Sequence, residues 1–233
     1  MEAIILAGGF GTRLRHVVKD VPKPMAPVAG QPFLKYIVEE VIRQGVTRII
    51  MAVHYKKEDI MSYFGNIYSG VPIIYSIEEE PLFTGGAVKM AMVNCKEEYV
   101  WIINGDTYFN VPMRHMMDEV TEKDMVAAIA VKEMEDFSRY GKVELDKNGT
   151  VVKFHEKCFC KKGWINGGIY VLRRDSLKDY PKRFSLEENF FPILLKDKKL
   201  YAFPSNGYFV DIGVPEDYNR AQVHFSKAGK LDA

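Results

Sequence analysis

Leu6-Ala-Gly-Gly-Phe-Gly-Thr-Arg-Leu14 continues directly from the apolar residues 3–6 near the start of the chain. The apolar run predicts a buried strand, and the glycines after it predict a sharp turn whose backbone comes close to a ligand. The turn begins like the dinucleotide-binding fingerprint, but Leu14 stands where the third glycine is needed, and no Gly-Lys-Ser/Thr closes a P-loop. Its amide N–H groups, followed by Arg13 and Lys23, still suit a triphosphate. The alternative is an ordinary strand-to-helix turn with exposed basic side chains.

Composition bounds the class of protein. The chain has 233 residues, 47% of them hydrophobic, which is enough for a full core. Its 32 Lys and Arg residues against 31 Asp and Glu give a net charge of +1, which argues against a surface dedicated to nucleic acid. No apolar run approaches the roughly 18 residues of a membrane span, and the N-terminus does not read as a signal peptide. The three cysteines form neither an even disulfide set nor a zinc pattern, so we expect reduced thiols and a cytoplasmic protein.

Apolar runs alternate with segments of helical periodicity along the first half of the chain. The predicted strands are residues 3–6, 48–53, 72–77 and 100–103, and the predicted helices are residues 33–42, 58–64 and 87–93. Strands that are apolar on both faces and alternate with helices indicate a mainly parallel sheet covered on both sides. We therefore predict a Rossmann-like α/β fold with helices on both faces of a mixed sheet.

The second half of the chain has a more mixed pattern. Asn148-Gly149 lies between two alternating runs, residues 142–145 and 150–154, and predicts a hairpin. Ser185-Leu-Glu-Glu188 is typical of a capping box that opens a helix. Because neither a linker nor an internal repeat interrupts the sequence, we predict one domain over residues 1–233.

Ligands of open α/β sheets bind beyond the carboxyl ends of the strands, so the residues after each apolar run are the candidates for a site. The glycine turn follows the first run, and Asn104-Gly-Asp106 follows the fourth. Glu156-Lys157 and Asp211 follow later runs. Glycine backbone, basic side chains and carboxylates are therefore predicted to meet at one edge of the sheet.

These motifs, in this order, resemble the sugar-nucleotide pyrophosphorylases, the nucleotidyltransferases that join a nucleoside triphosphate to a sugar 1-phosphate. The resemblance is carried by the glycine turn with Pro22-Lys-Pro24, Pro81-Leu-Phe-Thr-Gly-Gly-Ala87, Asn104-Gly-Asp106, Tyr140-Gly-Lys-Val143, Glu156-Lys157, Asn166-Gly-Gly-Ile-Tyr170 and Phe209-Val-Asp-Ile-Gly213. It covers nearly the full length. It implies a glycosyltransferase-A-like nucleotidyltransferase fold, with a nucleotide-binding half at about residues 1–110 and a sugar-phosphate-binding half at about 111–233.

Within the family, the short chain, the run Pro-Lys-Pro-Met-Ala-Pro-Val and Ser185-Leu-Glu-Glu are most similar to the D-glycero-D-manno-heptose 1-phosphate guanylyltransferases. The short chain also leads us to expect no attached acyltransferase or left-handed helix domain. The implied substrates are GTP and a sugar 1-phosphate, with neither nucleic acid nor membrane as a partner. The sequence leaves open whether the chain forms a homo-oligomer.

The resemblance assigns roles that fit the chemistry of nucleotidyl transfer. A sugar phosphate oxygen attacks the α-phosphorus while pyrophosphate leaves in line, so catalysis is mostly positioning and charge neutralisation. The attacking group is already an anion, and the need is for a divalent metal and cations rather than a general base. By carry-over, Arg13 and Lys23 hold the triphosphate, Lys157 takes the sugar phosphate, and Asp106 and Asp211 hold Mg²⁺. The alternative for the two aspartates is a role as helix N-caps.

The remaining residues are assigned to the two substrates in the same way. The implied nucleotide-binding residues are Leu6, Ala7, Gly8, Gly9, Gly11, Thr12, Arg13, Glu78, Gly85 and Asp106, and the implied sugar-phosphate-binding residues are Gly141, Glu156, Lys157, Asn166 and Asp211. His54 is predicted to be structural.

Glu78 departs from the family pattern in a way that bears on the base. Relatives that use uracil or thymine commonly carry glutamine nine residues before Ala87, where this chain carries Glu78. A carboxylate accepts both N1–H and N2–H₂ of guanine, so we predict GTP as the substrate. The alternative is that Glu78 is only the first of three exposed acids, which would leave a uridylyl- or thymidylyltransferase. Phe83 stands where many relatives place glycine beside the base, and the sequence does not decide whether its ring stacks or narrows the pocket.

The predicted reaction gives GDP-heptose and pyrophosphate for surface polysaccharide biosynthesis. Mannose 1-phosphate guanylyltransferase is the nearest alternative, because no residue visibly senses the difference between the two sugars. A binding protein that senses nucleotide sugars would keep the glycine turn without turnover, but the presence of both Asp106 and Asp211 favours an enzyme. A dinucleotide-dependent oxidoreductase is contradicted by Leu14.

Overall fold

The computed structural model describes residues 1–9 and 21–228. The strands are β1 (Glu2–Leu6), β2 (Pro27–Val28), β3 (Gln31–Pro32), β4 (Arg48–Val53), β5 (Ile67–Tyr68), β6 (Val71–Ile77), β7 (Tyr99–Asn104), β8 (Thr107–Phe109), β9 (Ala127–Phe137), β10 (Gly141–Leu145), β11 (Val151–Lys157), β12 (Cys160–Arg173), β13 (Leu200–Pro204) and β14 (Phe209–Asp211). The helices are α1 (Phe33–Arg43), α2 (Lys57–Phe64), α3 (Phe83–Met92), α4 (Met113–Glu122), α5 (Phe191–Lys196) and α6 (Pro215–Ala228). Short helical turns are η2 (Lys23–Met25), η3 (Arg174–Leu177) and η4 (Leu186–Phe190), the last of them π-helical.

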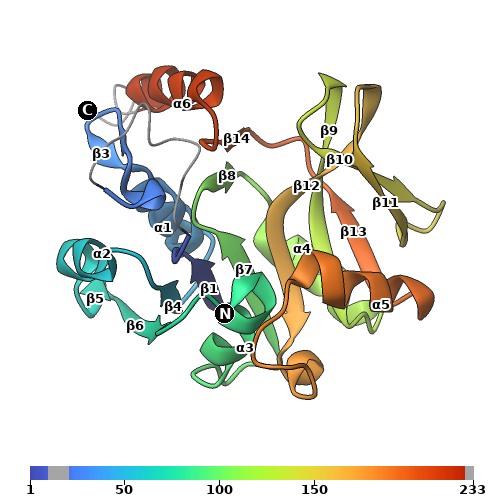
Figure 1. Cartoon of the computed structure of the whole chain (residues 1–233), viewed down its shortest axis with the longest axis horizontal. Coiled ribbons are helices and arrows are strands. Elements are labelled where there is room, and N and C mark those ends of the chain that lie inside the picture. The colour runs from blue at the N-terminus through green and yellow to red at the C-terminus, as the bar shows by residue number, and fades with distance from the viewer. Residues whose placement is uncertain (10–20, 229–233) are drawn as a thin grey trace.

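A mixed sheet runs through the molecule in the order β11-β10-β12-β7-β1-β4-β6-β5, and β9 pairs with both β12 and β13 beside this path (Figure 1). Strands β7, β1, β4 and β6 are parallel neighbours, whereas β12 runs antiparallel to β7. The predicted α/β class with a mixed sheet is thereby confirmed.

Alternate residues of the central strands enter two separate cores, because successive side chains of a strand point to opposite faces. Ile5 and Met51 lie in the core under α1, α2, α4 and α6, and Ile4 and Ile50 lie in the core under α3, η4 and α5. Helices therefore cover both faces of the sheet, as predicted. In the part of the chain that the structure describes, no helix is both long enough and apolar enough to cross a membrane.

Helix α3 begins at Phe83, earlier than the predicted start at residue 87. Glycines disfavour a helix by propensity, but here the first turn must pack closely on a neighbouring segment. A Cβ at Gly85 would lie 2.3 Å from the ring of Phe184, and one at Gly86 would lie 2.3 Å from the carbonyl oxygen of Lys182. Tertiary packing therefore explains both the glycines and the earlier helix start.

The predicted capping box at Ser185 is present in altered form. The Ser185 hydroxyl accepts a hydrogen bond from the Glu188 N–H at 3.2 Å, as expected, but the Ser185 N–H donates to Asn189 Oδ1 at 2.8 Å rather than to Glu188. Because the first turn is π-helical, the residue one position further along supplies the returning acceptor. The predicted hairpin at Asn148-Gly149 is confirmed by the antiparallel pairing of β10 with β11.

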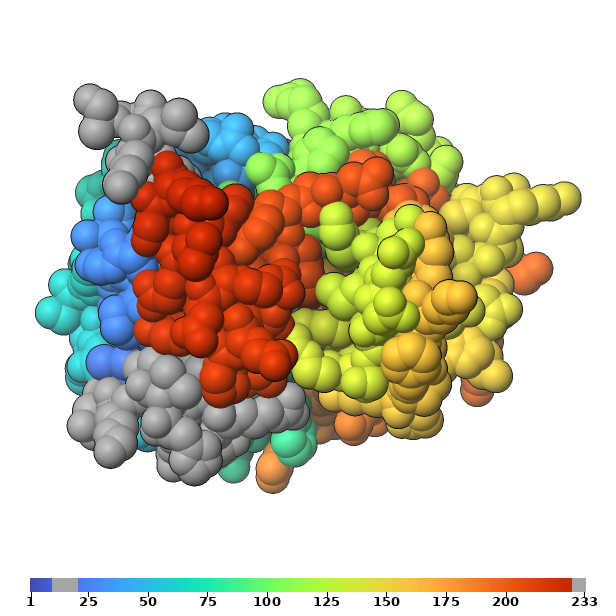
Figure 2. All heavy atoms as spheres, turned by 90° about the horizontal axis from the view of Figure 1, so that it is seen from above, coloured from blue at the N-terminus to red at the C-terminus, as the bar shows by residue number. Residues whose placement is uncertain are grey.

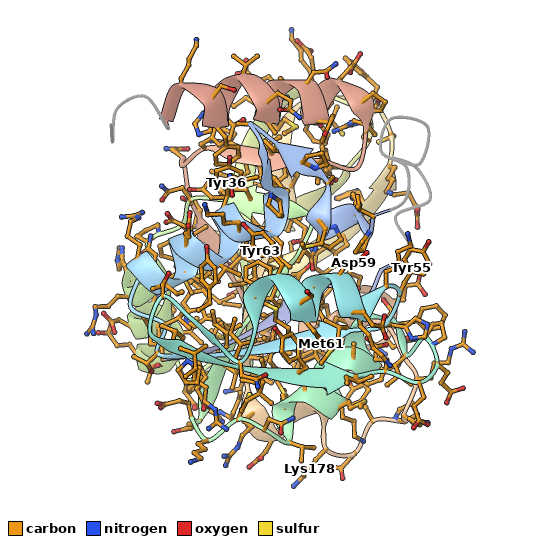
Figure 3. The ribbon with its side chains drawn as sticks, turned by 90° about the vertical axis from the view of Figure 1, so that its left-hand side faces the viewer. Tyr36, Tyr55, Asp59, Met61, Tyr63 and Lys178 are labelled. Carbon is orange, nitrogen blue, oxygen red and sulfur yellow. The ribbon has the colours of Figure 1, made fainter. Side chains whose placement is uncertain are left out.

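Helix α6 packs against the segment that precedes α1, and Figure 2 shows the two side by side. Gln222 accepts a hydrogen bond from the Ala29 N–H and donates one to the Pro27 carbonyl, both at 2.7 Å, and the Tyr218 hydroxyl donates to the same carbonyl. Tyr36, labelled on α1 in Figure 3, stacks on Phe225 of α6 with ring centroids 4.1 Å apart. The C-terminal helix thereby holds the stretch that begins at η2.

Gly105 lets the turn after β7 pass close to β1. Its N–H donates to the Leu6 carbonyl at 2.9 Å, and a Cβ there would lie 2.7 Å from that oxygen. We expect Gly105→Ala to lower the free energy of unfolding by about 1–3 kcal/mol, because backbone must move to admit the methyl group. Gly9→Ala, where an added Cβ would lie within 4 Å of no atom among the described residues, is the control and should stay within about 0.5 kcal/mol of the parent. Urea unfolding of both variants measures the difference, and equal values would contradict the close approach.

Candidate active site

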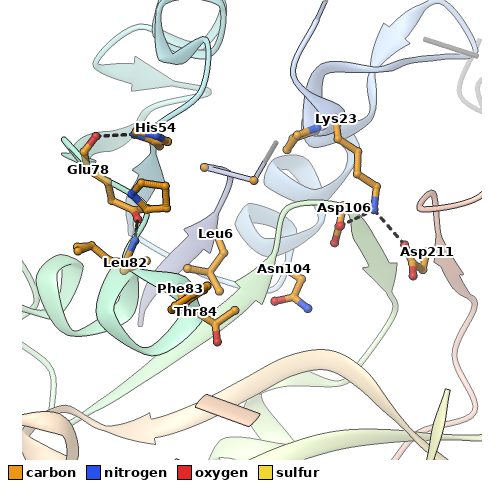
Figure 4. Close-up of a pocket in the computed structure, with 15 residues that line it drawn as sticks. Leu6, Lys23, His54, Glu78, Leu82, Phe83, Thr84, Asn104, Asp106 and Asp211 are labelled. Carbon is orange, nitrogen blue, oxygen red and sulfur yellow. Dashed lines mark hydrogen bonds and ion pairs between the residues drawn. The ribbon is translucent and has the colours of Figure 1, made fainter. Parts of the chain in front are cut away.

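A cavity of about 530 Å³ opens at the carboxyl ends of β1, β4, β6 and β7, a volume typical of small-molecule sites. The predicted site residues that line it are Leu6, Gly8, Gly9, Lys23, Glu78, Asp106 and Asp211. The other lining residues are Pro24, His54, Pro81, Leu82, Phe83, Thr84, Ala87 and Asn104. Figure 4 shows Glu78 and Leu82 on one side of this cavity and Lys23, Asp106 and Asp211 on the other.

Glu78 forms the first side of the cavity as a buried acceptor, whereas Glu79 and Glu80 beside it are exposed. Its Oε2 accepts a hydrogen bond from the Leu82 N–H at 3.0 Å. Its Oε1 lies so close to Gly8 that a Cβ there would be 3.0 Å away. Burial raises the pKa of Glu78, and the Leu82 N–H opposes the rise. The interpretation of Glu78 as one of three exposed acids is therefore wrong.

His54 lines the cavity although the sequence analysis treated it as structural. Its Nδ1 lies 2.8 Å from the carbonyl oxygen of Glu78, so this nitrogen is the donor. The residue directly follows β4 at the same sheet edge as the other candidates. The rule that selected Asp106 would also have selected His54.

The opposite side of the cavity is an ion-pair cluster of three residues. Lys23 Nζ lies 2.5 Å from Asp106 Oδ2 and 3.4 Å from Asp211 Oδ1, and the lysine side chain is 13% exposed. Burial, followed by the negative charge of Asp106, raises the pKa of Asp211, while Lys23 and the Gly213 N–H act in the opposite direction. Among the described residues, Lys23 therefore forms ion pairs with both carboxylates.

Asp106 and Asp211 are brought together by a strand pairing that the sequence analysis did not predict. Asp106 follows β7 of the main sheet, but Asp211 ends β14, which pairs antiparallel with β8 in a separate ribbon. Thr107 is the register partner of Asp211, and the Ile212 N–H donates to the Asp106 carbonyl at 3.1 Å. The prediction that Asp211 ends a strand is confirmed, although that strand does not belong to the main sheet.

The two carboxylates fit a Mg²⁺ site of the kind that borrows most of its ligands from substrate. Within residues 1–9 and 21–228 no group of three or more His, Cys, Asp and Glu gathers to hold a metal. Mg²⁺ commonly binds one or two protein carboxylates and completes its octahedron with phosphate oxygens and water. Burial and the negative charge of Asp106 raise the pKa of Asp211, and a bound divalent cation would favour the ionised form of both carboxylates.

Of the predicted sugar-phosphate residues, Asp211 lines the cavity, whereas Gly141, Glu156, Lys157 and Asn166 do not. Gly141 and Lys157 are register partners of β10 and β11, and both Glu156 and Lys157 are exposed. Tyr140, directly before Gly141, contacts Phe209 of β14 edge to face, with ring centroids 5.9 Å apart. Burial, followed by the negative charge of Asp211, raises its pKa to about 12. Tyr140 therefore links the hairpin of β10 and β11 to the strand that ends at Asp211.

Asn166 connects to the cavity through a chain of hydrogen bonds. Its Nδ2 donates to the Tyr170 hydroxyl at 3.1 Å, which in turn donates to Glu187 Oε1 at 3.2 Å. Glu187 Oε2 accepts from the hydroxyl of Thr84, a lining residue, at 2.6 Å. Burial and the charge of Glu187 raise the pKa of Tyr170, so its hydroxyl remains a donor. This series of hydrogen bonds joins the second half of the molecule to the first turn of α3.

The remaining predicted nucleotide-binding residues either do not line the cavity or lie outside the described residues. Ala7 is buried and its N–H donates to the Ala52 carbonyl at 2.8 Å. Gly85 does not line the cavity, and its N–H donates to the Phe184 carbonyl at 3.0 Å. Gly11, Thr12 and Arg13 lie outside the described residues.

Phe83 opens α3 with a φ of 59°, in the left-handed region. For a bulky side chain this conformation costs about 1–3 kcal/mol. The side chain is 56% exposed, so its own burial offsets little of that cost. Phe83 is therefore a strained residue at the mouth of the cavity.

Comparison with known proteins agrees with this geometry. The nucleotidyl transferase family matches residues 2–228. The D-glycero-alpha-D-manno-heptose 1-phosphate guanylyltransferase of Aneurinibacillus thermoaerophilus is 46% identical over 224 residues, which cover 95% of this chain and 97% of that protein. The mannose-1-phosphate guanyltransferase of Pichia angusta is 34% identical over 226 residues, covering 94% of this chain and 62% of that protein. The solved structure of HddC from Yersinia pseudotuberculosis complexed with GMP-PN has a TM-score of 0.85 and 37% identity, covering 96% of this chain and 99% of that chain.

We expect Asp106→Asn and Asp211→Asn each to weaken metal binding at least about tenfold, because each removes a carboxylate ligand. The measurement is titration with Mn²⁺ in the presence of a nucleoside triphosphate, followed by electron paramagnetic resonance. Asp118→Asn, at an exposed carboxylate on α4, is the matched control and should bind Mn²⁺ like the parent. Unchanged binding in both site variants would show that the metal is held elsewhere.

Proposed function

Because the chain belongs to the nucleotidyl transferase family, we propose that it transfers GMP from GTP to D-glycero-α-D-manno-heptose 1-phosphate, giving GDP-heptose and pyrophosphate. One observation carries the proposal: a single cavity has a buried carboxylate acceptor on one side and a lysine flanked by two carboxylates on the other. The first suits a guanine edge, and the second suits a triphosphate with its metal. The names of the similar proteins from Aneurinibacillus thermoaerophilus and Yersinia pseudotuberculosis support both the base and the sugar.

The phosphate side of the cavity carries the chemistry. Asp106 and Asp211 would hold Mg²⁺, which when bound would neutralise charge on the phosphate oxygens. Lys23 stands between these carboxylates and stabilises the negative charge that builds on the leaving pyrophosphate. Arg13, from the glycine turn, is proposed as the second cation on the triphosphate. The attacking sugar phosphate needs no base, so the protein acts by orientation and charge.

The sugar phosphate is assigned to the second half of the chain. Lys157 is proposed to bind its phosphate, while Glu156, Asn166 and the backbone of Gly141 bind hydroxyl groups. The hydrogen-bond chain from Asn166 to Thr84 supports this assignment, because it connects that half to the cavity wall. Under this assignment, and because Glu156 and Lys157 are exposed, the sugar would lie over the hairpin of β10 and β11.

We also propose that the enzyme works in the cytoplasm and supplies surface polysaccharide synthesis. Cys95, Cys158 and Cys160 are free thiols, which suits a reducing compartment.

Glu78→Gln tests the assignment of the base. Its amide presents a single acceptor oxygen where the carboxylate presents two, so one charge-assisted hydrogen bond to guanine is lost. ITP lacks the N2 amino group, and we expect the preference for GTP over ITP in kcat/KM to fall about tenfold or more. Glu79→Gln, at the exposed neighbour, should keep the parent preference. A full GTP preference in Glu78→Gln would remove this residue from base selection.

The reaction itself is tested by pyrophosphate release in the presence of Mg²⁺. GTP, ATP, UTP and dTTP are crossed with manno-heptose, mannose and glucose 1-phosphates. We expect release with GTP and the heptose phosphate. Pyrophosphate release with GTP and mannose 1-phosphate instead would support the reaction but assign a different sugar. No pyrophosphate release with any pair would contradict the proposal.

A further inference from the structure

Phe83 has three properties that are not expected together in a surface residue without a function. It has a φ of 59°, a conformation that glycine adopts without strain. Its side chain is 56% exposed. It lines the cavity beside Leu82, whose N–H is bonded to Glu78. The strain is therefore accompanied by an aromatic surface at the mouth of the cavity, next to the acceptor assigned to guanine.

Arg183 supports the ring. Its guanidinium carbon lies 4.5 Å from the centroid of the Phe83 ring, in a cation–π arrangement. The segment that carries Arg183 is tied to the start of α3 on both sides: the Phe184 N–H donates to the Leu82 carbonyl at 3.2 Å, and Lys182 forms an ion pair with Glu80 at 2.8 Å. The Phe83 ring therefore packs against a segment that is itself held to the start of α3 by a hydrogen bond and an ion pair.

The place of the ring suits a flat ligand. Glu78 offers hydrogen-bond acceptors, and these act in the plane of a base. A base held at its edge leaves its π-face open, and an aromatic side chain stacks on such a face in a sequence-tolerant way. A purine presents more area to the ring than a pyrimidine does. Phe83 and Glu78 thus supply complementary contacts from the same short stretch of chain.

We propose that Phe83, supported by Arg183, is the stacking surface for the nucleobase and strengthens the preference for purine over pyrimidine triphosphates. The inference rests on the proposed function, because it takes the cavity to be a nucleotide site. It goes beyond that function in giving the strained aromatic residue a task in base selection.

Phe83→Gly distinguishes a stacking role from a structural one, because the substitution should relieve backbone strain while it weakens nucleotide binding. Glycine relieves the left-handed conformation, so the midpoint of urea unfolding should stay equal or rise. Loss of the ring should weaken GTP binding about tenfold, measured by calorimetry, with a smaller loss for UTP. Phe83→Trp should keep GTP binding within about threefold, and the emission that this substitution adds should be quenched by GTP. Arg183→Gln should give an intermediate loss, since the ring remains without its support.

Tighter GTP binding by Phe83→Gly would overturn the proposal and show that the ring narrows the cavity. Unchanged binding of every triphosphate would overturn it as well. The proposed function is tested separately, by measuring the nucleotide preference of the parent protein. If the parent prefers UTP, the guanine assignment fails together with the purine preference given to Phe83, and only the stacking contact is retained if Phe83→Gly weakens UTP binding.

Discussion

The contact of Lys23 Nζ with the carboxylates of Asp106 and Asp211 is the interaction on which the site depends. The three residues come from η2, from the turn after β7 and from the end of β14, so no local segment can form the cluster. Helix α6 holds the stretch that starts with η2, and the pairing of β14 with β8 brings Asp211 beside Asp106. The C-terminal part of the chain therefore completes a site that begins at its N-terminus.

This cluster is better explained by function than by stability. Buried ion pairs contribute little net stability, because the desolvation of each charge offsets much of the attraction. Here two carboxylates share one lysine, and burial together with Asp106 raises the pKa of Asp211. An arrangement that holds unfavourable charge in a cavity is typical of active sites. Under the proposed function, a divalent cation would add positive charge beside these two carboxylates, and the triphosphate would supply its remaining ligands.

The sequence predicted the sheet and much of the cavity because both follow from local patterns. Apolar runs mark the parallel strands, and their carboxyl ends must meet at one edge, which is why Asp106 could be selected. Glu78 was selected by its place in the family pattern, nine residues before Ala87. The start of α3 and the ribbon that carries Asp211 could not be predicted, since each depends on partners distant in the chain. The resemblance implied a nucleotide-binding role for Gly85, but its close packing on Phe184 could be found only in the fold. The division of the single domain into two functional halves stays a prediction.

The cavity wall also joins what the sequence treats as separate halves. Thr84 accepts a hydrogen bond from the Leu186 N–H at 3.0 Å and donates to Glu187, so the first turn of α3 and η4 are tied at two points. Glu187 continues through Tyr170 to Asn166. Tyr170 is buried, so breaking either of its links leaves its hydroxyl without one of its partners in a place that water does not readily reach. Any movement of η4 must therefore disturb the turn that carries Phe83, so the start of α3, η4 and this part of β12 are linked as one structural unit.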